Sequence, residues 1–266
     1  MELILPPKKK RSAWKITRNI LITVAVAALY IWTFVSIDVN WGRVFSERTL
    51  TNMGRVIPQL FSPDWSAFGK VMGLMWETLQ MAYTGTLLAA ILAIPFGFFA
   101  ASNMVRSRIL NNFSKGVLNG IRAFPELVLA LMFVAAVGPK PFAGVLAIAI
   151  GSIGMLGKLY SEVIESIDMH VVEALQANGA NKIQVLFYGV IPQIIPEFLS
   201  YAIYRFEIDV RASTILGIIG AGGIGTLITI SIANRKWDEV GMILLVIIVV
   251  VTIIDMTSAF IRKRIV

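Results

Sequence analysis

Long apolar segments constrain this chain more than any other feature of its sequence. Six stretches are each long enough to cross a bilayer, which takes about 20 mostly apolar residues. They lie at about residues 16–37, 73–101, 117–138, 142–164, 193–216 and 239–261. Backbone amides and carbonyls that face lipid must be hydrogen-bonded within their own segment, so these stretches are expected to be helices. The sequence therefore predicts an all-α, polytopic membrane protein with about six transmembrane helices.

The composition supports lipid as the main solvent and excludes several kinds of site. Hydrophobic residues make up 57% of the 266 residues and charged residues 15%, whereas soluble domains average about 45–50% apolar and about 25% charged. The absence of cysteine excludes disulfides, thiolate metal sites and a cysteine nucleophile. The single histidine, His170, excludes zinc sites that need several imidazoles. The net charge of +8 is typical of cytoplasmic loops, so the bilayer and not nucleic acid is the expected partner.

The positions of lysine and arginine predict the orientation in the membrane. Basic residues gather before and at the start of the first stretch: Lys8, Lys9, Lys10, Arg11, Lys15 and Arg18. Since basic loops stay in the cytoplasm, the N-terminus is expected inside, and six spans return the C-terminus to the same side. The loops at 102–116 and 165–192 then lie inside, and 138–141, 217–238 and the interfacial segment 38–72 lie outside. The first stretch is longer than the apolar core of a signal peptide, so we expect it to stay uncleaved.

The inside loop at 165–192 has a helical pattern of its own. Its apolar residues recur on one face: Val172, Leu175, Ile183, Leu186 and Phe187. An amphipathic helix between two spans lies along the membrane surface or docks on a partner. Asp168 suits the N-cap of such a helix, and Gly179 suits its break.

The same loop contains a spaced motif. It consists of Glu173, Ala174, Leu175, Gly179, Gly189, Ile191 and Pro192. The spacing resembles the EAA loop of ABC importer permeases throughout, with three departures: Leu175 for the second alanine, Gly189 for isoleucine and Ile191 for leucine. In that family the loop forms a short coupling helix that sits in a cleft of the ATPase subunit. The resemblance implies contact with an ATPase through Glu173, Ala174, Leu175, Gly179 and Pro192; on the residues alone, an ordinary amphipathic connector stays open.

The resemblance extends over roughly residues 73–261 and is to the phosphonate-type branch of these permeases. The matching pieces lie at residues 77–82, 124–127, 154–159, 192–193, 204–213 and 217–225. It implies the type I importer fold in the bacterial inner membrane, with two copies forming one pathway. It also implies two ATPase subunits, which bind ATP and Mg²⁺, and an external binding protein that delivers a phosphonate or related phosphorus oxyanion. Residues 1–72 would then form a basic tail, first helix and outer segment, and residues 73–266 the permease core.

This chain itself is expected to be neither an enzyme nor a cofactor-binding protein. The run from Gly151 to Leu159 superficially resembles a phosphate-binding loop. However, five residues separate Gly151 and Gly157 instead of four, and Leu159 stands where serine or threonine would bind Mg²⁺. Lys158 is more simply paired with Glu162, four residues further along the helix.

Four charges in the fifth stretch are the strongest candidates for the translocation path. Arg205 and Asp209 are four residues apart, as are Glu207 and Arg211, so each pair can meet on one helix face. Such a set either fixes helix packing or presents an arginine to an anion in transit, and both readings stay open. Together with the glycine-rich run that follows and two glutamates, the candidate path comprises Arg205, Glu207, Asp209, Arg211, Ser213, Gly220, Gly222, Gly223, Glu77 and Glu126.

Three rival functions are compatible with parts of the sequence. A permease of the same class could carry an amino acid or a compatible solute. A proton-coupled secondary transporter could use Glu126 or Asp209 as its carrier, since ionisable residues within spans often relay protons. A membrane scaffold without transport is disfavoured by the charges in the fifth stretch. The glycine-rich run serves either close helix contact or a bent, cavity-lining backbone.

Overall fold

The computed structural model describes residues 13–37, 41–105 and 107–265, and every regular element in these ranges is helical. Lys8, Lys9, Lys10 and Arg11, on which the predicted orientation depends, lie outside the described residues. The chain divides into two compact units, residues 1–55 and 56–266. The division by role into residues 1–72 and 73–266 stays a prediction.

The first unit contains the first predicted span. Helix α1 (Ala13–Ser36) is long and apolar enough to cross a membrane. It is followed by the short helix α2 (Trp41–Val44) and by α3 (Glu47–Leu60), which runs across the boundary between the two units. The first span therefore has the length that its hydropathy predicts.

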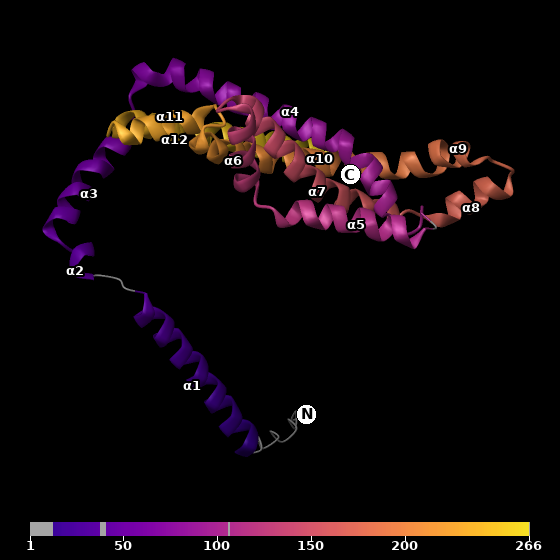
Figure 1. Cartoon of the computed structure of the whole chain (residues 1–266), viewed down its shortest axis with the longest axis horizontal. Coiled ribbons are helices and arrows are strands. Elements are labelled where there is room, and N and C mark those ends of the chain that lie inside the picture. Colours follow the sequence, from indigo (N-terminus) through magenta and orange to yellow (C-terminus); the bar gives the residue numbers. More distant parts are fainter. Residues whose placement is uncertain (1–12, 38–40, 106, 266) are drawn as a thin grey trace, which may run out of the picture. The chain divides into compact units, whose positions relative to one another are not determined.

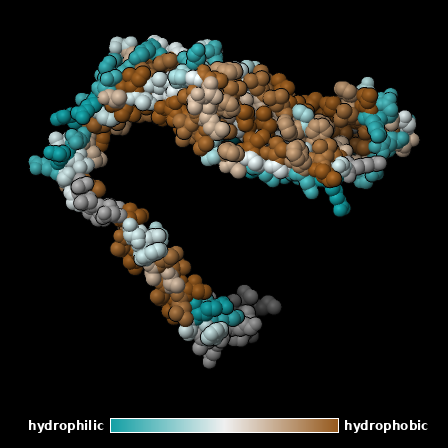
Figure 2. Space-filling view, viewed as in Figure 1, coloured by the Kyte–Doolittle hydropathy of each residue, from teal (hydrophilic) through white to brown (hydrophobic). Residues whose placement is uncertain are grey.

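The second unit is a bundle of four long helices with shorter ones around them (Figure 1). The long helices, which match the predicted second, fourth, fifth and sixth spans, are α4 (Phe68–Ala100), α7 (Pro141–Glu165), α10 (Ile191–Leu216) and α12 (Trp237–Ile265). The shorter elements are η1 (Trp65–Ala67), α5 (Arg108–Ala123), α6 (Glu126–Val137), α8 (Met169–Ala177), α9 (Lys182–Val185), η2 (Leu186–Val190), η3 (Gly217–Ile219) and α11 (Ile224–Ala233). On the face shown in Figure 2, hydrophobic residues cover the middle of this bundle and polar residues gather towards its ends. That distribution suits a bundle embedded in lipid.

The third predicted span, at 117–138, consists of two helices joined by a sharp bend. Helix α5 ends at Ala123 and α6 begins at Glu126, and the two are bent by 84°. Pro125 explains the break, because it lacks an amide hydrogen and disfavours helical backbone in the residue before it. Phe124 accordingly has an extended conformation, with φ −83° and ψ 124°. Within the described residues, five helices are long and apolar enough to span, and the bent pair would make a sixth.

Glycines let the other helices approach α7 closely. A methyl group on Gly85 of α4 would lie 2.7 Å from Cγ2 of Ile148, and one on Gly97 would lie 2.8 Å from Cβ of Tyr160. On a second side of α7, three glycines at three-residue intervals receive the broken pair α5–α6: Gly151, Gly154 and Gly157. Helix association within lipid depends on such close packing, because apolar side chains gain little by leaving lipid.

We predict that Gly85→Ala lowers the apparent melting temperature of the purified protein in detergent. The added methyl group would collide with Ile148, which is fully buried, and such overpacking typically costs about 1–3 kcal/mol. Gly73→Ala in the same helix is the matched control, since nothing lies within 4 Å of its added methyl group. The control should be neutral or stabilising, because alanine favours a helix over glycine by about 1 kcal/mol. Equal melting temperatures for the two variants would contradict this account of the packing.

Candidate functional site

A buried polar cluster lies in the middle of α10. Nη2 of Arg205 is 2.8 Å from Oδ1 of Asp209, which confirms the predicted pair at four-residue spacing. The side chains are 7% and 0% exposed. Nε of Arg205 donates to Oγ of Ser152 on α7 at 2.8 Å, and Nη1 approaches Sδ of Met155 at 3.1 Å. All three nitrogen atoms of the guanidinium thus have a partner within the bundle.

The same cluster joins four helices. Asp209 accepts hydrogen bonds from Thr86 of α4 at 2.7 Å and from Ser152 of α7 at 2.8 Å. Glu126, at the first turn of α6, forms an ion pair with Arg205. Glu126 is the most accessible member, with 27% of its side chain exposed. A buried charge is tolerated only when it is paired and hydrogen-bonded, so this cluster fixes α4, α6, α7 and α10 together.

The second predicted pair faces a different helix. Arg211 lies 2.9 Å from Glu207, as its spacing predicts, and 2.7 Å from Asp255 of α12. Arg262 of α12 in turn lies 3.1 Å from the other carboxylate oxygen of Glu207. The two charge pairs of α10 therefore occupy two faces of the helix. Sequence reasoning missed Asp255 and Arg262, although an acidic residue inside the last apolar stretch was a signal for a partner.

The glycine-rich run forms a tight turn between η3 and α11. Gly220, Gly222 and Gly223 have φ values of +91°, +86° and +69°, a region that residues with side chains rarely adopt. The backbone amide of Gly223 donates to Oε1 of Glu77 at 3.3 Å. The next amide, that of Ile224, donates to Oγ1 of Thr78 at 2.8 Å. The turn is thus both bent and closely packed, and two side chains of α4 accept hydrogen bonds from its backbone amides.

The ten predicted path residues do not form one site. Arg205, Asp209 and Glu126 make the central cluster, Glu207 and Arg211 face α12, and Glu77 meets the glycine turn. Ser213 is buried, and its hydroxyl donates to the carbonyl of Val210 within the same helix. Which of these residues contact a solute stays a prediction.

The loop at 165–192 folds as two short helices and a π-helix. Asp168 caps α8, because its Oδ1 accepts from the amide of His170 at 2.9 Å, as predicted. The chain turns at Gly179 with φ +81°. The amide of Gly179 donates to the carbonyl of Gln176 at 3.0 Å, and that of Ala180 to Leu175 at 3.1 Å. This pattern is a Schellman motif, which explains why glycine occupies position 179.

The predicted coupling residues differ in how far they are exposed. Glu173, Ala174 and Pro192 are exposed, whereas Leu175 is half-buried and its Cδ1 would lie 2.9 Å from a methyl group on Gly189. Apolar side chains also stand exposed here: Val171, Ile183, Phe187 and Tyr188. In Figure 1, α8 and α9 project beyond one end of the four long helices. The segment therefore presents an apolar surface outside the bundle.

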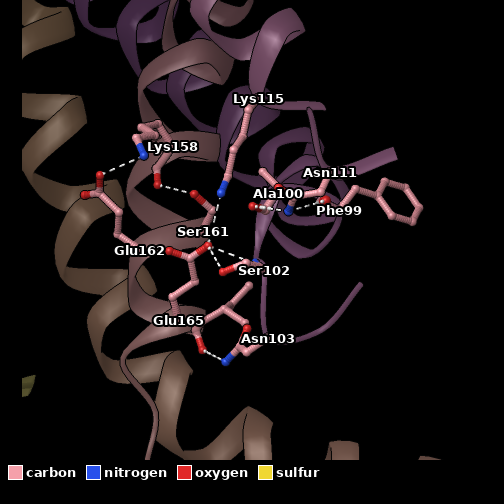
Figure 3. Close-up of polar contacts among 11 residues, drawn as sticks. Phe99, Ala100, Ser102, Asn103, Asn111, Lys115, Lys158, Ser161, Glu162 and Glu165 are labelled. Carbon is pink, nitrogen blue, oxygen red and sulfur yellow. Dashed lines mark hydrogen bonds and ion pairs between the residues drawn. The ribbon is translucent and has the colours of Figure 1, made fainter. Parts of the chain in front are cut away.

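A polar junction fixes the end of α7 from which this segment leaves (Figure 3). Oε1 of Glu165 accepts from the amide and hydroxyl of Ser102, both at 2.8 Å, and from Nζ of Lys115 at 3.3 Å. The side-chain amide of Asn103 donates to the carbonyl of Ile164 at 2.6 Å. One turn earlier, Lys158 and Glu162 form the predicted pair at 3.1 Å. The contacts of Glu165 and Ile164 tie the end of α7 to the loop between α4 and α5 and, through Lys115, to α5 itself.

Comparison with protein families identifies the class of transport system. Residues 93–266 match the family described as binding-protein-dependent transport system inner membrane component. The phosphite transport system permease protein PtxC of Stutzerimonas stutzeri is 36% identical over 94% of this chain and 90% of its own length. The phosphate-import permease protein PhnE of Mycolicibacterium smegmatis is also 36% identical, over 93% of this chain and 43% of its own length.

The fold also resembles that of a solved importer. A chain from inward-facing structures of the MetNI methionine ABC transporter superposes with a TM-score of 0.66. The match covers 76% of this chain and 99% of the other, at 19% sequence identity. At that identity the likeness concerns the fold, and it confirms the predicted type I importer fold.

We predict that Arg205→Met strongly destabilises the folded protein. The variant leaves the fully buried Asp209 without its counter-charge, and removing one partner of a buried pair typically costs about 3–5 kcal/mol. Combining Arg205→Met with Asp209→Asn and Glu126→Gln should recover much of the loss, because no buried charge is then left unpaired. Denaturant unfolding of the purified protein measures both effects. A single variant as stable as the natural protein would show that the cluster does not hold the bundle.

Proposed function

Since the chain belongs to the family of binding-protein-dependent transport system inner membrane components, we propose that it carries a phosphorus oxyanion across the bacterial inner membrane. As a member of that family, it is the multi-pass permease of an ABC importer and not the ATPase. The observation that carries the substrate class is the similarity to a phosphite permease over nearly the whole of both chains. Phosphite, phosphonates and phosphate share a tetrahedral phosphorus with anionic oxygens.

Two copies of the chain form one pathway, and two ATPase subunits bind the ATP and Mg²⁺ that drive it. The segment from Glu165 to Pro192 is the coupling element. Its exposed apolar side chains and the exposed Ala174 suit insertion into a cleft on the ATPase. An external binding protein delivers the anion to the opposite side.

Movement of the coupling element reaches the bundle through two fixed connections. At its start, Glu165 holds the end of α7 to Ser102 in the α4–α5 loop and to Lys115 of α5. At its end, the π-helix η2 continues directly into α10, which carries the central charged cluster. Closure of the ATPase dimer draws the two coupling elements together, and the pathway opens outward. Hydrolysis then resets it, so that access alternates between the two sides.

Both termini lie in the cytoplasm in this proposal. The coupling element must be cytoplasmic to meet the ATPase, and two spans, α10 and α12, lead from it to the C-terminal end, which therefore returns to the cytoplasmic side. Arg262, Lys263 and Arg264 lie in the last turn of α12, where the excess of basic residues favours the cytoplasm.

The rival functions are less compatible with the geometry. A proton carrier must be reachable from water. Asp209, however, is fully buried; it is paired with Arg205 and accepts hydrogen bonds from Thr86 and Ser152. Glu126 is partly exposed, but its carboxylate is paired with Arg205. An amino acid or a compatible solute remains the alternative cargo for the same fold.

We predict that the complex imports phosphorus oxyanions at the expense of ATP. The chain would be reconstituted in proteoliposomes with its ATPase and binding protein, and solute-stimulated ATP hydrolysis and uptake would be measured. The panel would contain phosphite, methylphosphonate, phosphate, an amino acid and glycine betaine. At least one phosphorus compound should stimulate both activities more than the other solutes. Stimulation by the amino acid or betaine alone would refute the substrate class.

We also predict that Gly179→Val uncouples the permease, whereas Gly179→Asn does not. No atom lies within 4 Å of a methyl group added at Gly179, so the defect comes only from the positive φ. A β-branched residue is strongly disfavoured there, but asparagine is tolerated. Solute-stimulated ATP hydrolysis should fall at least tenfold in the valine variant, while the asparagine variant keeps most of it. Equal rates in the two variants would mean that the turn at position 179 does not transmit coupling.

A further inference from the structure

Arg122 is a cationic side chain beside the middle of α7 that has no acidic partner among the described residues. Six other cations of the described bundle are each paired with an acidic residue: Lys70, Lys115, Lys158, Arg205, Arg211 and Arg262. Arg122 lies in the last turn of α5 and is exposed. It makes no ion pair or side-chain hydrogen bond with any residue that the structure describes.

The depth of Arg122 makes this lack of a partner significant. Its Cγ would lie 3.0 Å from a methyl group on Gly154, which is close to the middle of the 25-residue helix α7. Arg122 therefore leaves the backbone about half-way across the bundle. The favourable interaction of a cation with the C-terminus of α5 is smaller than the free-energy cost of an arginine charge at the centre of a bilayer. Arg122 consequently needs water or an anion beside it.

Arg122 also lies near the central cluster. Three side chains contact α7 close together. Glu126 lies against Gly151, and Arg122 lies against Gly154. Arg205 contacts Ser152 and Met155. These contacts fall within five consecutive residues of α7, a rise of about 6 Å along the helix axis. The two arginines and the glutamate thus share one stretch of α7.

The exposure and the partners of the two acidic residues indicate which ion pair of Arg205 can open. Asp209 is fully buried and is held by Arg205, Thr86 and Ser152. Glu126 is 27% exposed, and Arg205 is the only charged partner of its carboxylate among the described residues. Glu126 is therefore the exchangeable anion of the cluster.

We propose that Arg122 and Arg205 together bind the phosphorus oxyanion in transit, and that the Glu126 carboxylate occupies Arg205 when no solute is present. The proposal rests on the proposed function. An oxyanion that enters beside Arg122 displaces Glu126 from Arg205 and is held by two guanidinium groups. Glu126 then competes for Arg205 and returns the anion to the path. Such internal competition keeps binding weak, as a conducting site requires.

The first test asks whether Arg122 faces water. Because the chain contains no cysteine, single-cysteine variants can be labelled with a charged methanethiosulfonate reagent in nanodiscs, where both faces are accessible. Arg122→Cys should react at least tenfold faster than Ile248→Cys, whose side chain is 65% exposed on the apolar surface of α12. Equal labelling rates for the two variants would overturn the proposal.

The second test asks whether Glu126 competes with the anion. Binding of radiolabelled phosphite to the permease–ATPase complex in nanodiscs would be measured without the binding protein. Glu126→Gln keeps the shape of the side chain but removes its charge, so phosphite should bind about tenfold or more tightly than to the natural complex. Adding Arg122→Ala to this variant should abolish the gain. Unchanged binding in Glu126→Gln would contradict the competition.

The third test measures uptake in the full complex. Arg122→Ala should lower phosphite uptake at least tenfold, and Arg122→Lys should retain part of it. Arg108→Ala is the matched control, because it removes the same charge from the opposite end of α5, where Arg108 is exposed. Normal uptake by Arg122→Ala would sink this proposal but leave the permease function intact. Failure of the natural complex to import any phosphorus oxyanion would instead refute the proposed function itself.

Discussion

The architecture depends on one electrostatic constraint: charges placed inside an apolar bundle must be paired there. Arg205 meets this constraint by pairing with Asp209 on its own helix and with Glu126 on α6. Thr86 and Ser152 donate hydrogen bonds to Asp209. Because the members of the cluster come from four helices, the cluster defines the relative positions of α4, α6, α7 and α10. Lipid cannot supply this specificity, since it offers no hydrogen bonds.

Close packing and the polar contacts support the same arrangement. Glycines along α7 admit α4 on one side and the broken pair α5–α6 on another. The break at Pro125 turns the N-terminus of α6 towards α10, and Glu126 in its first turn can therefore reach Arg205. At the other end of α7, the contacts of Glu165 with Ser102 and Lys115 fix the start of the segment that carries α8. The segment that carries α8 is therefore tied to the bundle at its start.

The sequence revealed the local features of this structure well and the distant ones poorly. The pairs Arg205–Asp209 and Glu207–Arg211, the cap at Asp168 and the turn at Gly179 are confirmed, since helix geometry relates residues four apart and capping acts over a few residues. The partnership of Glu126 with Arg205 joins residues 79 apart, and no short pattern announces it. Hydropathy also concealed the break at Pro125, because the residues on both sides are apolar enough to suggest one span.

The central claim is that ATP moves the segment at 165–192 and that the bundle follows. The absence of cysteine allows one spin label on each copy, introduced as Gln176→Cys at the exposed end of α8. Double electron–electron resonance would then measure the distance between the two labels in the reconstituted complex. The account predicts a single distance without nucleotide that shortens when ATP is trapped with vanadate. An identical distance distribution in both states would contradict it.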